Sequence, residues 1–321
     1  MSLNVVITDC SWGNIEVEKE YLPENAVVEG YQLITEDEVI EACSDADAIL
    51  SEYAPITAKA LKALKKCKII SNSAIGFDNI DVKAAEELGI AVANVPGYCA
   101  HEVADHAMSL ILAASRNIVV YDKAVRKGEW NYEIGLEMDR LKGQVLGLAG
   151  FGKIAQFVAK RAQGFGFKVI ANDPFIKQEY ADSLNVKLVE IDKLLAESDI
   201  ISCHIPAIKD TIGYFNKEKF DKMAKCPIFI NTSRGRLVNE EDLADALENK
   251  KIRAAALDVL IEEPPTMNNR LFTFDNVIIT LHAGFFSKTA LREVRSRSAM
   301  NVTNFFQKEF NKINFVNKIR G

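Results

Sequence analysis

Three side chains suited to proton transfer and anion binding follow apolar runs in the second half of the chain. Arg234 comes after Ile-Phe-Ile-Asn-Thr-Ser, Glu263 lies four residues past the run ending Ala-Leu-Asp-Val, and His282 follows Val-Ile-Ile-Thr-Leu. If these runs are parallel strands, their carboxyl ends lie along one edge of a sheet, where such sheets bind ligands. The spacing therefore predicts that the three side chains share one site.

The three residue types complement one another chemically. An imidazole titrates near neutral pH, so His282 is suited to take a proton from a hydroxyl group. A carboxylate beside the ring, Glu263, would orient it and raise its pKa by favouring the charged form. Arg234 supplies a rigid fork of donors for a substrate carboxylate and a neighbouring oxygen. Together they predict removal of a hydroxyl proton from a small acid.

Each of these residues also has an ordinary structural interpretation when it is taken alone. A His after a strand is often only hydrogen-bonded within the fold, as His282 would then be. Glu263 before Pro-Pro and Arg234 in Ser-Arg-Gly are both typical of solvated turns. Their expected convergence on one sheet edge is the reason for preferring a site.

The segment from Val145 to Asp173 predicts a dinucleotide-binding unit. An apolar strand leads into Gly-Phe-Gly-Lys-Ile-Ala, a helix, a second strand and an acid. Gly150 permits a tight turn, Gly152 leaves room for a pyrophosphate, and Ala155 keeps the helix close to its strand. Asp173 would accept hydrogen bonds from ribose hydroxyls and repel a 2′-phosphate. No Arg follows it directly, so NAD is favoured over NADP.

A nicotinamide cofactor next to a base and an anion clamp is complete for oxidation of a 2-hydroxy acid, because hydride removal from C2 requires loss of the hydroxyl proton. The remaining histidines give no metal site. His101 and His106 are interpreted as capping or packing residues, and His204 ends a strand near the cofactor. None has a second ligand at metal-binding spacing, so no metal is expected.

Alternating strands and helices predict an α/β protein with two doubly wound parallel-sheet domains. We expect a flavodoxin-like substrate domain at 1–97 plus 285–321 and a Rossmann NAD-binding domain at 98–284. Expected strands of the first domain are 3–8, 46–50, 68–71 and 90–95, with helices at 36–43, 58–65 and 81–88. A helix at 102–116 leads to six strands at 145–149, 169–172, 200–204, 228–232, 254–259 and 277–281, and a helix at about 288–306 is expected to return to the first domain.

Composition sets the class of partner. The chain has 321 residues, 48% of them hydrophobic, which supplies two cores. A net charge of −6 with no Lys/Arg block argues against nucleic-acid binding. The six cysteines form no Cys-x-x-Cys pair, no signal peptide pattern begins the chain, and no apolar stretch is long enough to span a bilayer. A cytoplasmic protein with no membrane partner is expected.

Over nearly the whole chain the sequence resembles the D-isomer-specific 2-hydroxy-acid dehydrogenase family. The matching elements, together with His282, are Ser73-Ala74-Ile75-Gly76-Phe77-Asp78-Asn79-Ile80-Asp81, Glu102-Val103-Ala104-Asp105-His106, Gly150-Phe151-Gly152-Lys153-Ile154-Ala155, Asn231-Thr232-Ser233-Arg234-Gly235 and Ala256-Leu257-Asp258-Val259 through Glu263-Pro264.

The resemblance implies that Arg234, Glu263 and His282 are the catalytic residues of an NAD-dependent D-2-hydroxy-acid dehydrogenase. The backbone at Ile75 and Gly76 would hold the substrate carboxylate. Asp258 would approach the nicotinamide amide. The candidate cofactor-binding residues are Gly150, Phe151, Gly152, Lys153, Ile154, Asp173, His204, Pro206, Thr232, Asp258 and His282.

Two positions depart from the family pattern without removing a functional atom. Leu281 stands where a proline usually precedes the His, and Ala155 replaces the third glycine. Formate oxidation is disfavoured, because it has no proton to remove and the resembling formate enzymes carry Gln at the position of Glu263. Chains of the phosphoglycerate type often carry an added regulatory domain, for which this sequence has no room.

Within the family, Tyr98-Cys99 and His282-Ala283-Gly284-Phe285-Phe286-Ser287 resemble the branch related to the C-terminal-binding-protein corepressors. An NADH-responsive scaffold with little turnover is therefore the alternative to an enzyme. The retained Arg, Glu and His favour the enzyme, since a pure scaffold has no need of all three.

The expected pocket loops, 51–57 and 72–79, contain no Lys or Arg. A phosphorylated substrate would lack a second cation there. Tyr53, Ile75 and Phe285 instead offer apolar surface. We therefore expect 2-keto acids with uncharged side chains, the D configuration of the product being implied by the resemblance alone. A homodimer is expected.

Overall fold

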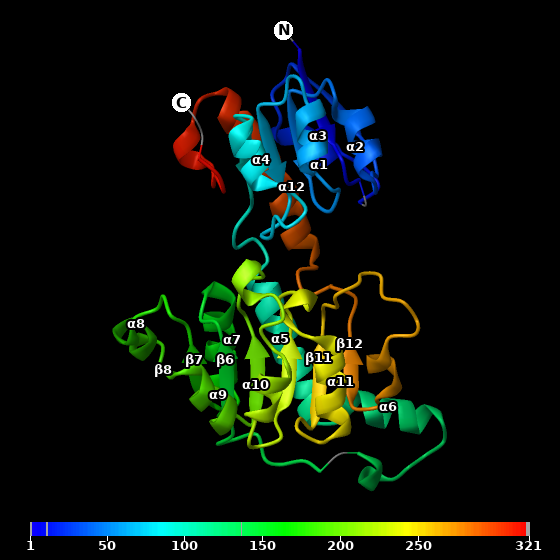
Figure 1. Ribbon diagram of the computed structural model, residues 1–321, viewed down its shortest axis with the longest axis vertical. Coiled ribbons are helices and arrows are strands. Elements are labelled where there is room, and N and C mark those ends of the chain that lie inside the picture. The colour runs from blue at the N-terminus through cyan, green and yellow to red at the C-terminus, as the bar shows by residue number, and fades with distance from the viewer. Residues whose placement is uncertain (1, 11, 136, 319–321) are drawn as a thin grey trace. The chain divides into compact units, whose positions relative to one another are not determined.

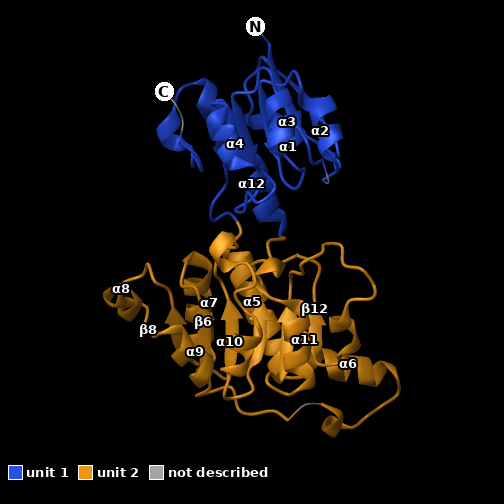
Figure 2. Cartoon of the chain, in the orientation of Figure 1, with its two compact units in different colours: residues 1–98, 287–321 blue, residues 99–286 orange. Residues whose placement is uncertain are grey.

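Two separate parallel sheets organise the chain in the computed structural model, which describes residues 2–10, 12–135 and 137–318 (Figure 1). Unit 1 comprises residues 1–98 and 287–321, and unit 2 comprises residues 99–286 (Figure 2). The division expected from the sequence, after residues 97 and 284, lies one and two residues earlier. The predicted fold class, two α/β units with doubly wound parallel sheets, is confirmed.

Unit 1 contains a sheet with the strand order β2-β1-β3-β4-β5, in which all neighbours are parallel. This is a flavodoxin-like order. Strands β3, β4 and β5 are buried along their whole length, because helices cover both faces of the sheet. The strands are β1 (Leu3–Ile7), β2 (Ala26–Gly30), β3 (Ala48–Ser51), β4 (Ile69–Asn72) and β5 (Ala91–Ala93).

The helices of unit 1 enclose two hydrophobic clusters. Side chains of α2, α3 and α4 pack into one cluster, and those of α12 pack into the other, with α1 against α12. Helix α12 lies far along the chain, so the end of the chain completes unit 1 as the sequence predicts. The helices are α1 (Glu16–Tyr21), α2 (Glu36–Cys43), α3 (Ala58–Ala63), α4 (Val82–Glu87) and α12 (Lys288–Phe306).

Unit 2 contains a seven-stranded parallel sheet in the order β12-β11-β10-β9-β6-β7-β8. The chain runs outward from β6 through β7 to β8 and then returns to β9 on the other side of β6. This reversal creates a switch point between β6 and β9, where doubly wound sheets bind ligands. The strands are β6 (Val145–Ala149), β7 (Lys168–Asn172), β8 (Lys187–Leu188), β9 (Ile200–Cys203), β10 (Ile228–Asn231), β11 (Ala254–Leu257) and β12 (Val277–Ile279).

Alternate strand residues of unit 2 face two different cores. On β10, for example, Ile228 and Ile230 join the cluster under α5 and α7, whereas Phe229 joins the cluster under α9, α10 and α11. Both faces are thus covered by helices. The helices are α5 (Ala100–Ser115), α6 (Ile118–Arg126), α7 (Lys153–Gly164), α8 (Gln178–Ser183), α9 (Ile191–Glu197), α10 (Lys217–Asp221) and α11 (Glu240–Glu248).

Sequence patterns missed the elements that contribute least to the cores. The expected six strands of unit 2 are corrected to seven, because the edge strand β8 has only two residues and shows no alternation. Strand β2 was not expected either; it is an edge strand with no buried residue, and its apolar run is only the three residues Ala26, Val27 and Val28. The six-residue helix α1 was also missed, because four of its residues are charged and its one fully buried residue is Glu18.

Within the described residues, no single helix is long and apolar enough to cross a membrane. Among these residues, only α5 and α6 taken together, with a bend between them, reach the length and composition that a crossing needs. The same residues contain no group of three or more His, Cys, Asp or Glu side chains placed to hold a metal ion. All six cysteines are free thiols.

Candidate active site

The carboxyl edge of the sheet in unit 2 gathers polar residues from six strands. Because all strands of this sheet are parallel, the residues that follow them emerge at the same edge. The residues at or just beyond the strand ends are Gly150 after β6, Asp173 after β7, His204 after β9, Thr232 after β10, Asp258 after β11 and His282 after β12.

The proposed base and its carboxylate partner are in direct contact. The Nδ1 atom of His282 lies 2.7 Å from Oε2 of Glu263, and the other carboxylate oxygen accepts a hydrogen bond of 2.9 Å from the peptide N–H of Leu260. Burial acts to raise the pKa of Glu263. Hydrogen bonding to His282, its charge, and that of Arg234 outweigh burial and lower the pKa below its ordinary 4.5. Glu263 is therefore the ionised partner of the ring.

Arg234 lies in a turn that is stabilised by the side chain of the nearby Asn231. The Asn231 side chain accepts from the peptide N–H of Ser233 at 3.0 Å and donates to the carbonyl of Arg234 at 2.9 Å. Asn side chains stabilise turns in this way by replacing backbone partners. Arg234 also lies close enough to Glu263 for its charge to lower that pKa. The structure thus brings Arg234, Glu263 and His282 to one place.

Gly235 sets the distance between the loop of Arg234 and the loop of Glu263. A Cβ atom at Gly235 would lie 1.9 Å from the carbonyl carbon of Leu260 and 2.0 Å from its oxygen. Backbone cannot move aside as a side-chain tip can, so any larger residue would push the two loops apart. The glycine that follows Arg234 therefore fixes the spacing of two site residues.

A buried carboxylate, Asp258, holds the turn that carries His282. Its oxygens accept hydrogen bonds from Thr280 Oγ1 at 2.5 Å, from Ala283 N at 2.9 Å and from Gly284 N at 2.8 Å. The Nε2 atom of His106, on α5, lies 3.2 Å from the same carboxylate. Burial acts to raise the pKa of Asp258, but these hydrogen bonds outweigh it and lower the pKa below 3.8.

His282 has an unusual backbone. Its φ of 54° is in the left-handed region, which non-glycine residues enter rarely. The conformation is held by a 2.7 Å hydrogen bond from its peptide N–H to the carbonyl of Asp258. The Phe285 ring lies edge-on, with its centroid 6.3 Å from that of His282. Asp258 thus supports His282 through both its carbonyl and its side chain.

His106 and Thr280 are the residues that sequence reasoning missed. His106 was interpreted as a capping or packing residue, yet its Nε2 atom lies 3.0 Å from Thr280 Oγ1 and beside Asp258. The signal was the Glu102 to His106 segment, which resembles the family pattern at a position where core packing needs only Val103 and Ala104. Asp258 was expected to approach the nicotinamide amide. In the structure its carboxylate accepts hydrogen bonds within the protein, and the contact with the cofactor stays a prediction.

The glycine loop fits the diphosphate of a dinucleotide. Gly150 has φ of 90°, and a Cβ there would lie 2.7 Å from the backbone of His204, so only glycine permits this turn. A Cβ at Gly152 would meet nothing within 4 Å, which leaves open space beside the loop. Gly152 also begins α7 without any side-chain cap, so the first peptide N–H groups of this twelve-residue helix can receive phosphate oxygens.

Other candidate cofactor residues differ in what they offer. Thr232 Oγ1 is buried without a hydrogen-bond partner, which suits a ligand that supplies one. His204 lies with Nε2 2.9 Å from Ser202 Oγ, and burial lowers its pKa to about 4, so its ring is neutral. Phe151 is fully buried, so it could reach a cofactor only through its backbone. Two further candidates, Lys153 and Ile154, form the first turn of α7, and Pro206 is exposed beyond β9.

Asp173, the expected ribose ligand, supports the glycine loop. Its two oxygens accept hydrogen bonds from Phe151 N at 2.8 Å and from Phe175 N at 2.9 Å. A carboxylate can accept about four hydrogen bonds, so capacity for two ribose hydroxyls remains. The acid therefore links loop geometry to cofactor choice.

The expected substrate residues of unit 1 lie beyond β4 and β3. The carbonyl of Ile75 accepts a 2.7 Å hydrogen bond from the Asn94 side chain, and that of Gly76 accepts one of 2.6 Å from Asn72. Holding these carbonyls fixes the peptide groups that are expected to bind a carboxylate. Tyr53, which is 57% exposed, has room to contact a ligand.

Comparison with known proteins identifies the family of the chain. The family model for the NAD-binding domain of D-isomer specific 2-hydroxyacid dehydrogenases matches residues 108–284. The hydroxypyruvate reductase of Thermotoga maritima is 41% identical over 264 residues, covering 81% of this chain and 85% of that protein. The D-3-phosphoglycerate dehydrogenase of Archaeoglobus fulgidus is 37% identical over 289 residues, covering 89% of this chain and 54% of that protein.

A solved structure extends the likeness to the whole fold. The D-lactate dehydrogenase of Aquifex aeolicus, in complex with NAD and lactic acid, superposes with a TM-score of 0.86 at 26% identity, covering 98% of both chains. The chain belongs to the D-isomer-specific 2-hydroxyacid dehydrogenase family and contains its NAD-binding domain. The predicted family and NAD cofactor are thus confirmed. The chain spans about half the length of the D-3-phosphoglycerate dehydrogenases it matches.

The position of Asp173 yields a prediction about the cofactor. We expect NADH to bind at least about tenfold more tightly than NADPH, because the carboxylate repels a 2′-phosphate. Asp173→Asn keeps an oxygen that can accept from Phe151 N but removes the charge, so it should reduce the difference in affinity between NADH and NADPH. Asp173→Ala should narrow it too and weaken both cofactors. Fluorescence titration measures this, and equal affinities in the wild type would contradict the assignment.

Proposed function

We propose that this protein is an NAD-dependent oxidoreductase that interconverts a small 2-keto acid and its D-2-hydroxy acid. The observation that carries the proposal is the contact of His282 with an ionised Glu263 beside Arg234, at the sheet edge that also holds the glycine loop. A proton donor, an anion clamp and a dinucleotide site in one place suit carbonyl reduction. The D configuration rests on family membership.

In the proposed reaction, bound NADH supplies a hydride to C2 of the keto acid. Arg234 binds the carboxylate and the C2 oxygen, which orients the carbonyl and stabilises negative charge developing on that oxygen. His282 delivers its proton to the same oxygen, and Glu263 stabilises the imidazolium before transfer. In the oxidative direction, neutral His282 takes the hydroxyl proton.

The charges of unit 1 favour a substrate without a phosphate group. The Asp9 carboxylate follows β1 and accepts hydrogen bonds from the peptide N–H groups of Glu52 and Tyr53 at 2.8 and 3.1 Å. Glu52 is itself buried, and burial together with the charge of Asp9 raises its pKa to about 8. Loops 51–57 and 72–79 contain no Lys or Arg. Glu52 is therefore mostly neutral near pH 7, and a phosphate bound at this edge would lie near the Asp9 carboxylate with no cation in these loops.

The proposal is tested by following NADH absorbance across a panel of 2-keto acids. We expect turnover of members with uncharged side chains, such as hydroxypyruvate, glyoxylate, pyruvate or phenylpyruvate, and poor turnover of phosphohydroxypyruvate. Arg234→Gln should lower kcat/KM at least about 100-fold while NADH affinity stays unchanged, because the clamp acts on the substrate. Preference for the phosphorylated member would refute the substrate class. Tight NADH binding without any turnover would favour the NADH-responsive scaffold.

The Glu263 and His282 pair predicts opposite pH dependences for the two directions. With the pKa of Glu263 below 4.5, its carboxylate stays ionised above about pH 5, so the ring alone sets the profile there. Reduction needs the imidazolium and should fall as pH rises, whereas oxidation should rise. Glu263→Gln removes the charge that favours the imidazolium and should move both midpoints about 1 unit to lower pH. Unchanged midpoints would show that the pair is not the proton relay.

We further propose a homodimer, because unit 2 exposes apolar side chains on one extended segment. Helix α6 and the residues after it extend from the body of unit 2 (Figure 1). Ile118 and Val125 are 56% and 51% exposed, and Trp130 and Tyr132 are 90% and 80% exposed. Several large apolar side chains exposed on one segment favour an interaction site there. A second copy of the chain is the proposed occupant, since a two-fold interface uses the same surface twice.

Light scattering after size exclusion measures this directly. We expect wild-type mass near twice that of the chain, and Trp130→Lys should shift it toward the monomer because it places a charge in the interface. Leu88→Lys, at a 46% exposed position of unit 1, is the matched control and should remain dimeric. A monomeric wild type at micromolar concentration would overturn the assignment.

A further inference from the structure

The loop that carries Glu263 has little packing of its own. Residues 261–268 form no helix or strand, and Ile261 and Met267 are 57% and 87% exposed. Buried apolar anchors stand only at its two ends, at Leu260 and Leu271, which are 6% and 1% exposed. Since exposed segments with few apolar contacts open most easily, the position of Glu263 depends on polar contacts at the loop ends.

Glu240, in the first turn of α11, connects both ends of this loop. Its Oε1 atom accepts a 2.6 Å hydrogen bond from the peptide N–H of Ile261. Its Oε2 atom accepts a 2.8 Å hydrogen bond from the side chain of Asn269. One carboxylate therefore closes the loop two residues before Glu263 and again six residues after it. Hydrogen bonds to an ionised acceptor are stronger than neutral ones.

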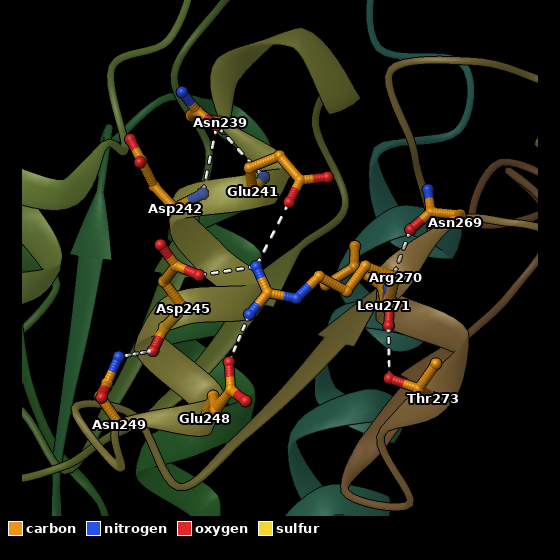
Figure 3. Close-up of polar contacts among 10 residues, drawn as sticks. All are labelled: Asn239, Glu241, Asp242, Asp245, Glu248, Asn249, Asn269, Arg270, Leu271 and Thr273. Carbon is orange, nitrogen blue, oxygen red and sulfur yellow. Dashed lines mark hydrogen bonds and ion pairs between the residues drawn. The ribbon is translucent and has the colours of Figure 1, made fainter.

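Arg270 extends the same attachment along α11. Its guanidinium lies 2.6 Å from Asp245 and 3.3 Å from Glu241, and it also contacts Glu248 (Figure 3). Successive turns of one helix thus supply three carboxylates to one cation. The side chain of Asn269 accepts from Leu271 N at 2.9 Å and so starts the short helical turn that carries Arg270. The carboxylates of α11 form a fixed support for the end of the loop.

We propose that Glu240 is a positioning residue that holds the Glu263 carboxylate against His282 by closing the 261–269 loop on α11. The inference rests on the proposed function of the Glu263 and His282 pair and extends it to a residue outside that pair. Glu240 differs from Arg270 in that it contacts the loop backbone at Ile261, next to the residue whose N–H binds Glu263. Exposed ion pairs such as those of Arg270 contribute little singly, so Glu240 is the principal contact.

The test compares Glu240→Ala with Asp242→Ala. Both residues are acids in the first turn of α11. Each side chain accepts a hydrogen bond from a backbone N–H, and the alanine substitution removes that bond. Asp242, however, accepts its hydrogen bond from Lys217 N at the start of α10, not from the loop of Glu263. Helix stability and the helix dipole therefore change alike in the two variants. Only the Glu240 variant releases the loop.

We expect Glu240→Ala to lower kcat for keto-acid reduction about 10- to 100-fold, since small displacements of a catalytic group have effects of this size. Its pH midpoint should move in the same direction as that of Glu263→Gln, with NADH affinity within about twofold of the wild type. Glu240→Gln, which keeps one acceptor, should lie between. Added to Glu263→Gln, the Ala substitution should shift the midpoint no further. Asp242→Ala should keep the wild-type kcat and profile within about twofold.

A second readout does not require turnover. NMR titration of the imidazole signals follows the ring of His282, which Glu263 contacts. The His282→Asn variant assigns the His282 signal. The charged groups around Glu263 are His282 and Arg234. In the Glu240→Ala variant, the pH midpoint of the His282 titration should move toward the midpoint measured in the Glu263→Gln variant. If the wild type reduces no keto acid yet the midpoint moves, the proposed function fails and the positioning role stands. If Glu240→Ala matches Asp242→Ala in both readouts, the positioning role is overturned.

Discussion

A buried carboxylate cannot remain in the interior without partners, and Asp258 imposes that requirement on the candidate active site. Leaving such a charge unpaired would be strongly unfavourable, so donors must converge on it from several elements. The turn after β12 supplies two peptide N–H groups and a hydroxyl, and α5 supplies His106. In its observed conformation the turn supplies Asp258 with these partners. That conformation gives His282 its positive φ and aims its ring at Glu263.

The sequence predicted the sites that are local in the chain better than those that are built by tertiary contacts. Runs such as Val145 to Ala149 and the glycines after them follow fixed spacing, so strand, turn and helix could be located from residue types alone. The rim position of His282 followed from topology, because parallel strands present their ends together. His106 could not be placed in this way, since its partner Asp258 is distant in sequence and joined to it only by helix packing.

The missed elements share a different physical cause. Strands β2 and β8 lie at sheet edges and need few apolar residues, so their formation depends on pairing with a neighbour rather than on their own pattern. Acids were similarly ambiguous. By residue type alone, Glu240 cannot be told from a solvated acid at a helix start, and only the fold shows that its carboxylate accepts a hydrogen bond from the backbone of another loop. The type of a residue limits its possible interactions, but its role depends on the partners that the fold brings to it.

Gly235 has a consequence for how this enzyme family can diversify. With no room for even one added carbon, the loop of Arg234 and the loop of Glu263 are in backbone contact at this glycine. A larger residue there would displace both loops, so on the proposed function it would disturb the anion clamp and the partner of the base together. Substitutions at the ends of β1 and β3 in unit 1 lie outside this contact. On the same proposal, substrate range can change there without altering the proton chemistry.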